Sequence, residues 1–278
     1  MIRFCLLFTI FLSLNQYIMA QDSENKNINY LQNNGSKICY RDIGSGNTTI
    51  VLVSGGTLCL ETCKSFQQQL SNHARVISYD RNGLGNSDYI PNGKNIGAMT
   101  EELDLIINKL NVNTPVVLVG HSIGGYIVRK YAELHPQKVK ALFLIDAYHE
   151  LFYKELKAAV KERMWNDYIG NWQSLISQVP PGAADEIGFN LELMKSDERY
   201  PVPPDIPVYL FTSIKEVGIE ERFVEFNKRA FEVHLRLNKQ LENEHRNLHH
   251  IITDKSSHYI YLDEPELITS EILKTIVD

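Results

Sequence analysis

Residues 115–131 constrain the fold of this chain more than any other stretch. An apolar run of valine and leucine at 116–119 leads into the sequence GHSIGG at 120–125, and apolar residues then recur at helical spacing through Tyr131. A short apolar run that ends in glycine predicts a buried strand, and apolar residues three and four positions apart predict one face of a helix. The chain is therefore expected to turn sharply from a strand into a helix at Ser122.

This turn matches the pattern G-x-S-x-G, in which the flanking residues must be small because the backbone turns so tightly. Such a turn, a nucleophile elbow, holds Ser122 in strained backbone geometry with its hydroxyl exposed at the N-terminus of the following helix. The N–H groups and the positive dipole at that helix end would face any anion that forms there. Ser122 is therefore predicted to be a catalytic nucleophile rather than an incidental serine in a turn.

Strand and helix patterns alternate through the first half of the chain. The expected strands, besides the one before Ser122, are 49–53, 76–79 and 139–145. Helices are expected at about 61–70 and after Thr100, which is a candidate N-cap. This alternation predicts an α/β fold, with a parallel sheet covered by helices on both faces. An antiparallel hairpin is expected to precede it, because Asn34-Gly35 lies between alternating apolar residues.

The alternation stops between about residues 149 and 204. This insert contains both tryptophans, Trp165 and Trp172, among apolar residues at helical spacing. We expect a helical lid insert whose inner face could line a pocket. Alternatively, its aromatic side chains only pack the insert onto the body of the domain. The remaining expected elements are strands at 208–211 and 249–252, a helix at about 220–242 and a last helix beginning near Pro265.

The first 20 residues differ from the rest of the chain. Arg3 is their only charge, residues 4–14 are largely apolar, and Ala20 precedes a polar segment. This layout predicts a secretory signal peptide rather than an uncleaved anchor, so that residues 21–278 form the mature domain and the protein is exported to the periplasm or the extracellular space. No later run is long and apolar enough to predict a membrane span. With a net charge of -6 and no basic block, the sequence predicts no nucleic-acid partner.

Three cysteines, Cys39, Cys59 and Cys63, follow the predicted signal segment. An odd number in an exported chain implies at least one free thiol or an intermolecular bridge. Cys59 and Cys63 are four residues apart near the start of an expected helix, and we expect them to be packing residues.

Three further motifs accompany the elbow: SGG at 54–56 after one strand, YDRNGLG at 79–85 after the next, and Ser257-His258 before the last helix. In content and order these motifs resemble the α/β-hydrolase superfamily, and the resemblance covers roughly residues 28–278. It implies an eight-stranded, mostly parallel sheet. It also implies a catalytic triad whose members follow one another along the chain as serine, acid and histidine.

A serine hydroxyl needs a base within hydrogen-bond reach and a third group that orients this base. His258 is the predicted base, because it follows the last strand in a polar loop. The other candidates fit less well: His249 and His250 lie within a strand, His245 is near a helix end, and His121 is expected to pack under the elbow. No pair of histidines shows metal-ligand spacing with a carboxylate, so neither a metal nor another cofactor is predicted.

Two residues remain candidates for the acid. Asp146 ends the strand after the elbow helix, whereas much of the superfamily places the acid after the next strand, where this chain offers Glu216. Asp146 is preferred because its short side chain lies closer to a strand end. Asp254 is too near His258 in sequence to be chosen, and Asp80 is expected to shape its own turn.

The oxyanion formed on attack needs preorganised N–H donors. Ile123, which follows the nucleophile, is predicted to supply one backbone donor, and Gly56 the other, with Thr57 as the neighbouring alternative. The superfamily often has His-Gly in this loop, where the present chain has Ser54-Gly55.

These residues predict an exported serine hydrolase that cleaves carboxylic esters through an acyl-enzyme. Its expected partner is a small-molecule ester or amide. A peptidase or amidase with the same triad is the nearest alternative, and a ligand-binding protein without turnover is another, because a fold alone does not define a function. A serine at position 122 disfavours epoxide and haloalkane hydrolysis, which in this superfamily imply an aspartate there.

Overall fold

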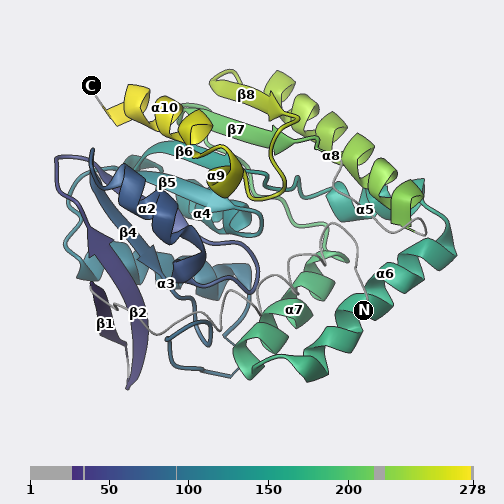
Figure 1. The fold of residues 1–278 in the computed structure, drawn as a ribbon, viewed down its shortest axis with the longest axis horizontal. Helices are drawn as coiled ribbons and strands as arrows, with labels where there is room; N and C mark the ends of the chain where they lie inside the picture. The colour runs from purple at the N-terminus through teal and green to yellow at the C-terminus, as the bar shows by residue number, and fades with distance from the viewer. Residues whose placement is uncertain (1–26, 34, 92, 216–222, 277–278) are drawn as a thin grey trace.

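A computed structural model describes residues 27–33, 35–91, 93–215 and 223–276. The predicted signal peptide and Glu216 lie outside the described residues. At the centre is one eight-stranded sheet with helices against both faces (Figure 1). The strands are β1 (Ile28–Asn33), β2 (Ser36–Ile43), β3 (Thr49–Val53), β4 (Arg75–Tyr79), β5 (Val116–His121), β6 (Val139–Ile145), β7 (Val208–Ser213) and β8 (Leu248–Thr253).

The strand order is β1-β2-β4-β3-β5-β6-β7-β8. Strand β2 runs antiparallel to both β1 and β4, and all other neighbours are parallel. The predicted hairpin is confirmed, since β1 and β2 pair with Asn33 opposite Ser36. The carboxyl ends of the parallel strands therefore meet at one edge of the sheet, which is where open α/β sheets bind their ligands.

The helices are η1 (Leu60–Cys63), α2 (Lys64–Leu70), α3 (Ile96–Lys109), α4 (Gly124–Leu134), η2 (Pro136–Lys138), α5 (Phe152–Ala159), α6 (Glu162–Leu175), η3 (Ile176–Gln178), α7 (Pro181–Leu193), α8 (Val224–Glu244), α9 (Ile260–Asp263) and α10 (Pro265–Ile276). Side chains of β3 alternate between the two faces. Val51 and Val53 pack in the core shared with α3, α4 and α8, whereas Ile50 and Leu52 pack in the core shared with α2, α9 and α10. The predicted α/β architecture with helices on both faces is confirmed.

The prediction that Thr100 caps its helix is wrong. Helix α3 begins at Ile96, and the side chain of Asn95 accepts a hydrogen bond from the N–H of Ala98 at 2.9 Å. Asparagine is as good an N-cap as threonine, and the earlier start brings Ile96 and Met99 onto the buried face. The Thr100 hydroxyl instead donates to the carbonyl of Ile96 inside the helix.

The predicted insert is helical, and it comprises α5, α6, η3 and α7 between β6 and β7. Trp165 is buried and its ring lies beside that of Tyr168, which in turn packs against Phe226 of α8. These rings connect the insert with the body of the domain. Its opening as a lid stays a prediction.

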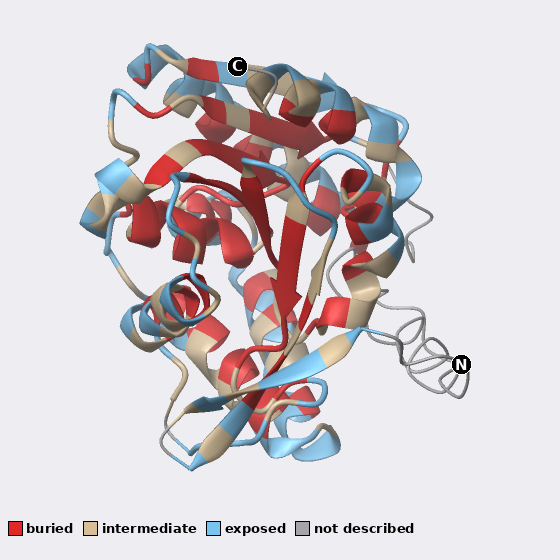
Figure 2. Ribbon diagram, turned by 90° about the vertical axis from the view of Figure 1, so that its left-hand side faces the viewer, coloured by how far each residue is buried: buried red, intermediate tan, exposed pale blue. Residues whose placement is uncertain are grey.

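Burial decreases from the middle of the sheet towards the N-terminal hairpin. Every residue of β3 and β5 is buried, whereas β1 is partly exposed along its length (Figure 2).

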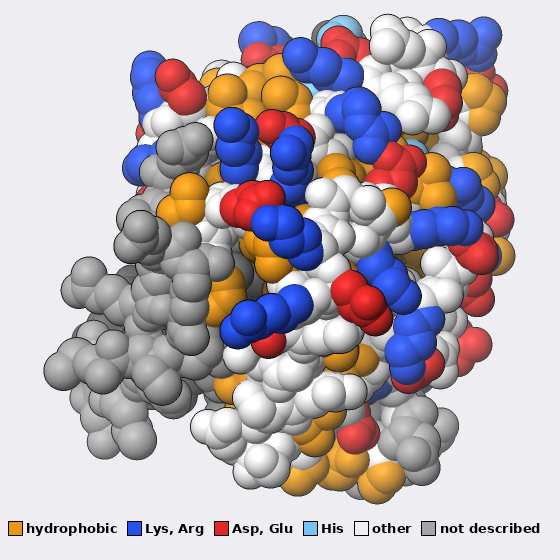
Figure 3. All heavy atoms as spheres, turned by 90° about the vertical axis from the view of Figure 1, so that its right-hand side faces the viewer, with side chains coloured by type: hydrophobic (Ala, Val, Ile, Leu, Met, Phe, Trp, Pro, Cys, Tyr) orange, Lys and Arg blue, Asp and Glu red, His pale blue; other side chains and the backbone are white. Residues whose placement is uncertain are grey.

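On the face that includes α6 and α8, basic and acidic side chains are interspersed (Figure 3). Ion pairs such as Arg229 with Glu232 and Arg236 with Glu155 account for part of this pattern. None of the helices in the described ranges has both the length and the apolar content needed to cross a membrane.

Helix α4 packs onto the sheet through Gly124. A Cβ atom at this position would lie 2.3 Å from the carbonyl oxygen of Val53 at the end of β3. Because that neighbour is backbone, it cannot move aside as a flexible side chain would. The close contact sets the distance between the elbow and the loop after β3.

We predict that Gly124→Ala lowers the free energy of unfolding by about 1–3 kcal/mol, because the added methyl group overpacks the contact with Val53. Unfolding in urea measures the change. Gly170→Ala is the matched control, since nothing lies within 4 Å of a Cβ added at Gly170 in α6. The control should keep or raise stability, because alanine is the better helix residue. Equal stability of wild type and Gly124→Ala would contradict the prediction.

Candidate active site

Ser122 lies in the sharp turn between β5 and α4. Its φ is +52°, a left-handed conformation that costs energy for a residue with a side chain. The turn leaves no space at Gly120, where a Cβ atom would lie 2.6 Å from the carbonyl oxygen of Gly124. The Ser122 N–H donates to the carbonyl of Ile145 in β6 at 3.0 Å, which holds the strained turn against the neighbouring strand. The strand, turn and helix predicted from the sequence are all present.

Asp146 follows β6 directly and is also strained, with a φ of +44°. Its Oδ2 lies 2.7 Å from Nδ1 of His258, and its Oδ1 accepts the N–H of Ser213 at 2.8 Å. Because β6 and β7 are neighbouring parallel strands, both bonds form at the carboxyl edge of the sheet. The structure therefore brings together the acid and the base that the sequence indicated.

His258 follows β8 and is buried. His121 supports it from below the elbow, with Nε2 3.0 Å from the carbonyl oxygen of His258. Since Asp146 contacts Nδ1, the nitrogen left for a reacting group is Nε2. His258 and Ser122 line the same cavity.

The carboxylate of Asp146 has a second histidine partner that sequence reasoning missed. His234 of α8 is buried and places Nε2 3.1 Å from Asp146 Oδ1. Burial acts to raise the pKa of Asp146, but the hydrogen bonds from His234 and His258 outweigh it and hold that pKa well below its usual range. The available signal was a pair of polar residues, His234 and Asn238, one turn apart on the buried face of an amphipathic helix.

The other candidate histidines do not contact Asp146: His121 adjoins His258, and the rest lie outside the cavity. His121 is buried, and burial together with the neighbouring His258 lowers its pKa well below the usual value, so it stays neutral. His245 caps the end of α8, His249 is exposed on β8, and His250 contacts the hydroxyl of Thr212. Asp254 is exposed. Asp80 shapes its turn as expected, because its carboxylate accepts the N–H groups of Leu60 and Asn86.

Cys39, Cys59 and Cys63 are free thiols. Cys39 and Cys63 are buried, and burial raises the pKa of each to about 12. Neither forms a thiolate at neutral pH, which fits the expectation that Cys63 serves in packing.

The loop after β3 lies beside Ser122. Gly56 and Ile123, the two predicted oxyanion donors, both line the cavity, and a Cβ atom at Gly56 would lie 3.7 Å from Cγ2 of Ile123. Thr57 has a φ of +59°, and its N–H donates to the carboxylate of Glu186 in α7. The alternative donor is therefore already engaged, which leaves Gly56 as the candidate in this loop.

Aromatic side chains form a large part of the cavity wall. Besides the imidazoles of His121 and His258, they are Tyr126, Tyr148, Tyr153, Trp172 and Tyr259. Tyr153 and Trp172 come from the insert, as do the lining residues Leu175 and Asn190. Burial raises the pKa of Tyr126 and of Tyr148 well above the ordinary value, so both phenols stay protonated. An apolar substituent next to the reacting group suits such walls.

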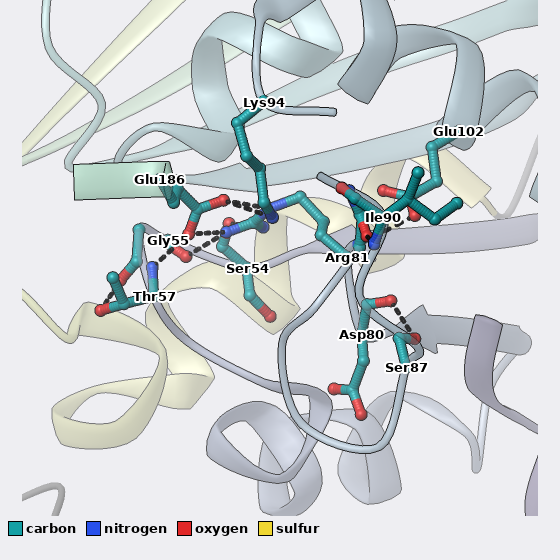
Figure 4. Close-up of polar contacts among 12 residues, drawn as sticks. Ser54, Gly55, Thr57, Asp80, Arg81, Ser87, Ile90, Lys94, Glu102 and Glu186 are labelled. Carbon is teal, nitrogen blue, oxygen red and sulfur yellow. Dashed lines mark hydrogen bonds and ion pairs between the residues drawn. The ribbon is translucent and has the colours of Figure 1, made fainter. Parts of the chain in front are cut away.

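A buried charge cluster contacts residues 54–57, the predicted oxyanion loop that carries Gly56 (Figure 4). Arg81 donates to the carbonyls of Ser54 and Gly55, each at 2.6 Å, and pairs with Glu186 at 2.9 Å. Lys94 is 3.5 Å from the same carboxylate. Burial acts to raise the pKa of Glu186, but Arg81 and Lys94 outweigh it and lower that pKa, so Glu186 is ionised. The cluster ties the insert to the loop that carries Gly56.

An α/β sheet with a strained serine at the end of β5 and a histidine–aspartate pair at the same edge defines a class of hydrolytic folds. A family model described as the alpha/beta hydrolase fold matches residues 48–184. An AB hydrolase superfamily protein of Gibberella zeae is 24% identical over 76% of this chain and 80% of that protein. The pimeloyl-[acyl-carrier protein] methyl ester esterase of Salmonella newport is 30% identical over 39% of this chain and 40% of that enzyme.

Solved structures agree on the fold. An esterase from Exiguobacterium antarcticum superposes with a TM-score of 0.65 at 20% identity, over 90% of this chain and 99% of that one. The chain spans only 25–47% of the length of the first curated relatives that it matches. Residues 48–184 match the α/β-hydrolase family, and the structure has the fold of that family.

Glu102 gives the folding stability of the protein a testable pH dependence. This partly buried side chain accepts the N–H of Asn82 at 2.9 Å, and burial raises its pKa from 4.5 to about 7. Between these two values the unfolded chain has released the proton and the folded chain retains it. Stability therefore falls as pH rises through this window.

We predict that Glu102→Gln, which removes the ionisation, gains about 1–3 kcal/mol of unfolding free energy relative to wild type as pH rises from about 5 to about 8. Urea unfolding at both pH values measures the difference. Glu101→Gln is the control, because Glu101 is exposed on the same helix. A constant difference between Glu102→Gln and wild type across this range would contradict the prediction.

Proposed function

We propose that this protein is an exported serine hydrolase that cleaves carboxylic esters through an acyl-enzyme. In this proposal Ser122 is the nucleophile, His258 the general base and acid, and Asp146 the group that orients His258. The N–H groups of Gly56 and Ile123 bind the oxyanion.

The proposed reaction has two halves. The Ser122 oxygen bonds to the carbonyl carbon while its proton passes to His258 Nε2. The bond from that carbon to the alcohol oxygen then breaks, and the alcohol leaves with the proton from His258. Water attacks the acyl carbon by the same route, so that the acid is released and Ser122 regains its proton.

One observation carries this proposal: the 2.7 Å contact between Asp146 and His258 Nδ1, in a cavity that Ser122 also lines. This contact fixes the tautomer in which Nε2 is free to accept a proton. Because Asp146 makes it, Asp146 is preferred over Glu216. The left-handed backbone of Ser122 is the strain expected at a nucleophile elbow.

The choice of an ester as substrate rests on similar proteins and on the walls of the cavity. The Salmonella newport relative is named a methyl ester esterase and the Exiguobacterium antarcticum structure an esterase. The aromatic walls of the cavity suit an apolar group on the substrate. Export rests on the signal-like sequence of residues 1–20.

We predict that Ser122→Ala abolishes hydrolysis of p-nitrophenyl esters and labelling by a fluorophosphonate probe, because both need the serine oxygen. The variant should unfold at a temperature close to that of wild type. Undiminished turnover in Ser122→Ala would reject the mechanism. A wild-type protein that is neither labelled nor active on a graded ester series would favour a binding protein without turnover.

We predict that Asp146→Asn lowers kcat by about 10³- to 10⁴-fold, because an amide at this position no longer holds His258 in the productive tautomer. Steady-state kinetics on the best p-nitrophenyl ester measure the change. Glu216→Gln is the comparison and should keep kcat within about twofold, because in this proposal Asp146 and not Glu216 orients His258. The reverse ranking of these two variants would make Glu216 the acid.

A further inference from the structure

Helix α7 of the insert is anchored directly to the loop that carries Gly56. Glu186, fully buried, accepts the N–H of Thr57 and pairs with Arg81, which also binds the carbonyls of Ser54 and Gly55 (Figure 4). Breaking such a cluster would leave a buried charge without a partner, which is strongly unfavourable. A second contact reinforces the first: a Cβ atom at Gly182, at the start of α7, would lie 2.1 Å from the carbonyl oxygen of Gly83. These contacts fix α7 against the loop.

Asn190 follows Glu186 by four residues, so the two side chains emerge on the same face of α7. Its carboxamide reaches the oxyanion loop, since a Cβ atom at Gly56 would lie 3.3 Å from Asn190 Nδ2. The same hypothetical atom would lie 3.7 Å from Ile123, the other predicted donor residue. Asn190 therefore adjoins the place where both backbone donors are expected.

The Asn190 side chain is a polar group in the wall of the cavity that no other group of the described residues engages. The residue is 8% exposed and lines the cavity together with Ser122 and His258. Within the described part of the chain it makes no side-chain hydrogen bond. Its polar atoms are not sealed in the interior, because they remain accessible from the cavity. The carboxamide is therefore free to bind a ligand that enters the cavity.

We propose that Asn190 is a further catalytic residue, whose side-chain N–H donates to the carbonyl oxygen of the substrate and stabilises the oxyanion together with Gly56 and Ile123. This role rests on the proposed hydrolysis by Ser122. Asparagine side chains are suitable oxyanion donors. The insert thereby supplies part of the reacting site as well as a wall, and the cluster around Glu186 keeps this donor in position.

The test compares Asn190→Leu, which keeps the shape and removes the donor, with wild type on p-nitrophenyl acetate, butyrate and octanoate. Removing an oxyanion donor lowers kcat by about 10²- to 10³-fold. We expect a loss of this size, similar for all three esters and with little change in KM, because the oxyanion is common to them. Asn190→Asp should lose at least as much, since a carboxylate repels the developing negative charge.

Control measurements distinguish the loss of an oxyanion donor from a loss of folding and from a failure of the proposed Ser122 mechanism. Glu192→Gln, on the exposed side of α7, should leave kcat unchanged, and all variants should keep the melting temperature of wild type within a few degrees. Three outcomes for Asn190→Leu would overturn this role and leave the Ser122 mechanism intact. They are a kcat within about twofold of an active wild type, a rise in KM without a fall in kcat, and a fall in kcat with only one of the three esters. An inert wild type would instead overturn the proposed function.

Discussion

The carboxylate of Asp146 is the interaction on which the arrangement of the site depends. Its two oxygens bind groups from three segments that follow it in the chain: the N–H of Ser213 in β7, His234 in α8 and His258 after β8. A buried carboxylate is stable only when its hydrogen-bonding capacity is filled. The contacts that satisfy the charge of Asp146 therefore also hold β7, α8 and the segment after β8 in place relative to β6.

Strain in the backbone is concentrated at this edge of the sheet. Of the five non-glycine residues with positive φ in the described ranges, Thr57 and Ser122 line the cavity, and Asp146 contacts His258, which also lines it. Each is held by a specific hydrogen bond: Thr57 by Glu186, Ser122 by Ile145 and Asp146 by Phe211. Such conformations persist only where the surrounding structure determines them. Here they place the predicted nucleophile, the predicted acid and the loop with the predicted oxyanion donor within a single region.

The insert contributes to the site through polar as well as apolar contacts. Its aromatic residues line the cavity, and Glu186 connects it to the loop after β3 through Arg81. A fully buried ion pair contributes little net stability compared with apolar packing, but it strongly disfavours any arrangement in which the two charges separate. This contact explains why α7 is held at the oxyanion loop rather than only resting on the body of the domain.

Short-range patterns in the sequence determined many of the structural elements of this protein. The elbow around Ser122, most of the strands and the helical character of the insert follow from apolar periodicity and glycine placement, which act within a few residues. Asp146 and His258 could be selected because parallel strands end at a common edge, so position relative to a strand end implies proximity. The start of α3 was misplaced because Asn95 and Thr100 are both residue types that favour the N-cap position.

Other features depended on the tertiary structure alone. His234 and Glu186 lie in helices far along the chain from their partners Asp146 and Arg81, and Asn190 is equally far in sequence from Gly56, which it adjoins. A polar residue on a buried helix face carries no local sign of what it contacts. The choice of Gly56 over Thr57 likewise required knowing that Glu186 already occupies the Thr57 N–H. Sequence periodicity specifies which face of an element is buried, but only the packing of distant elements decides which polar groups meet there.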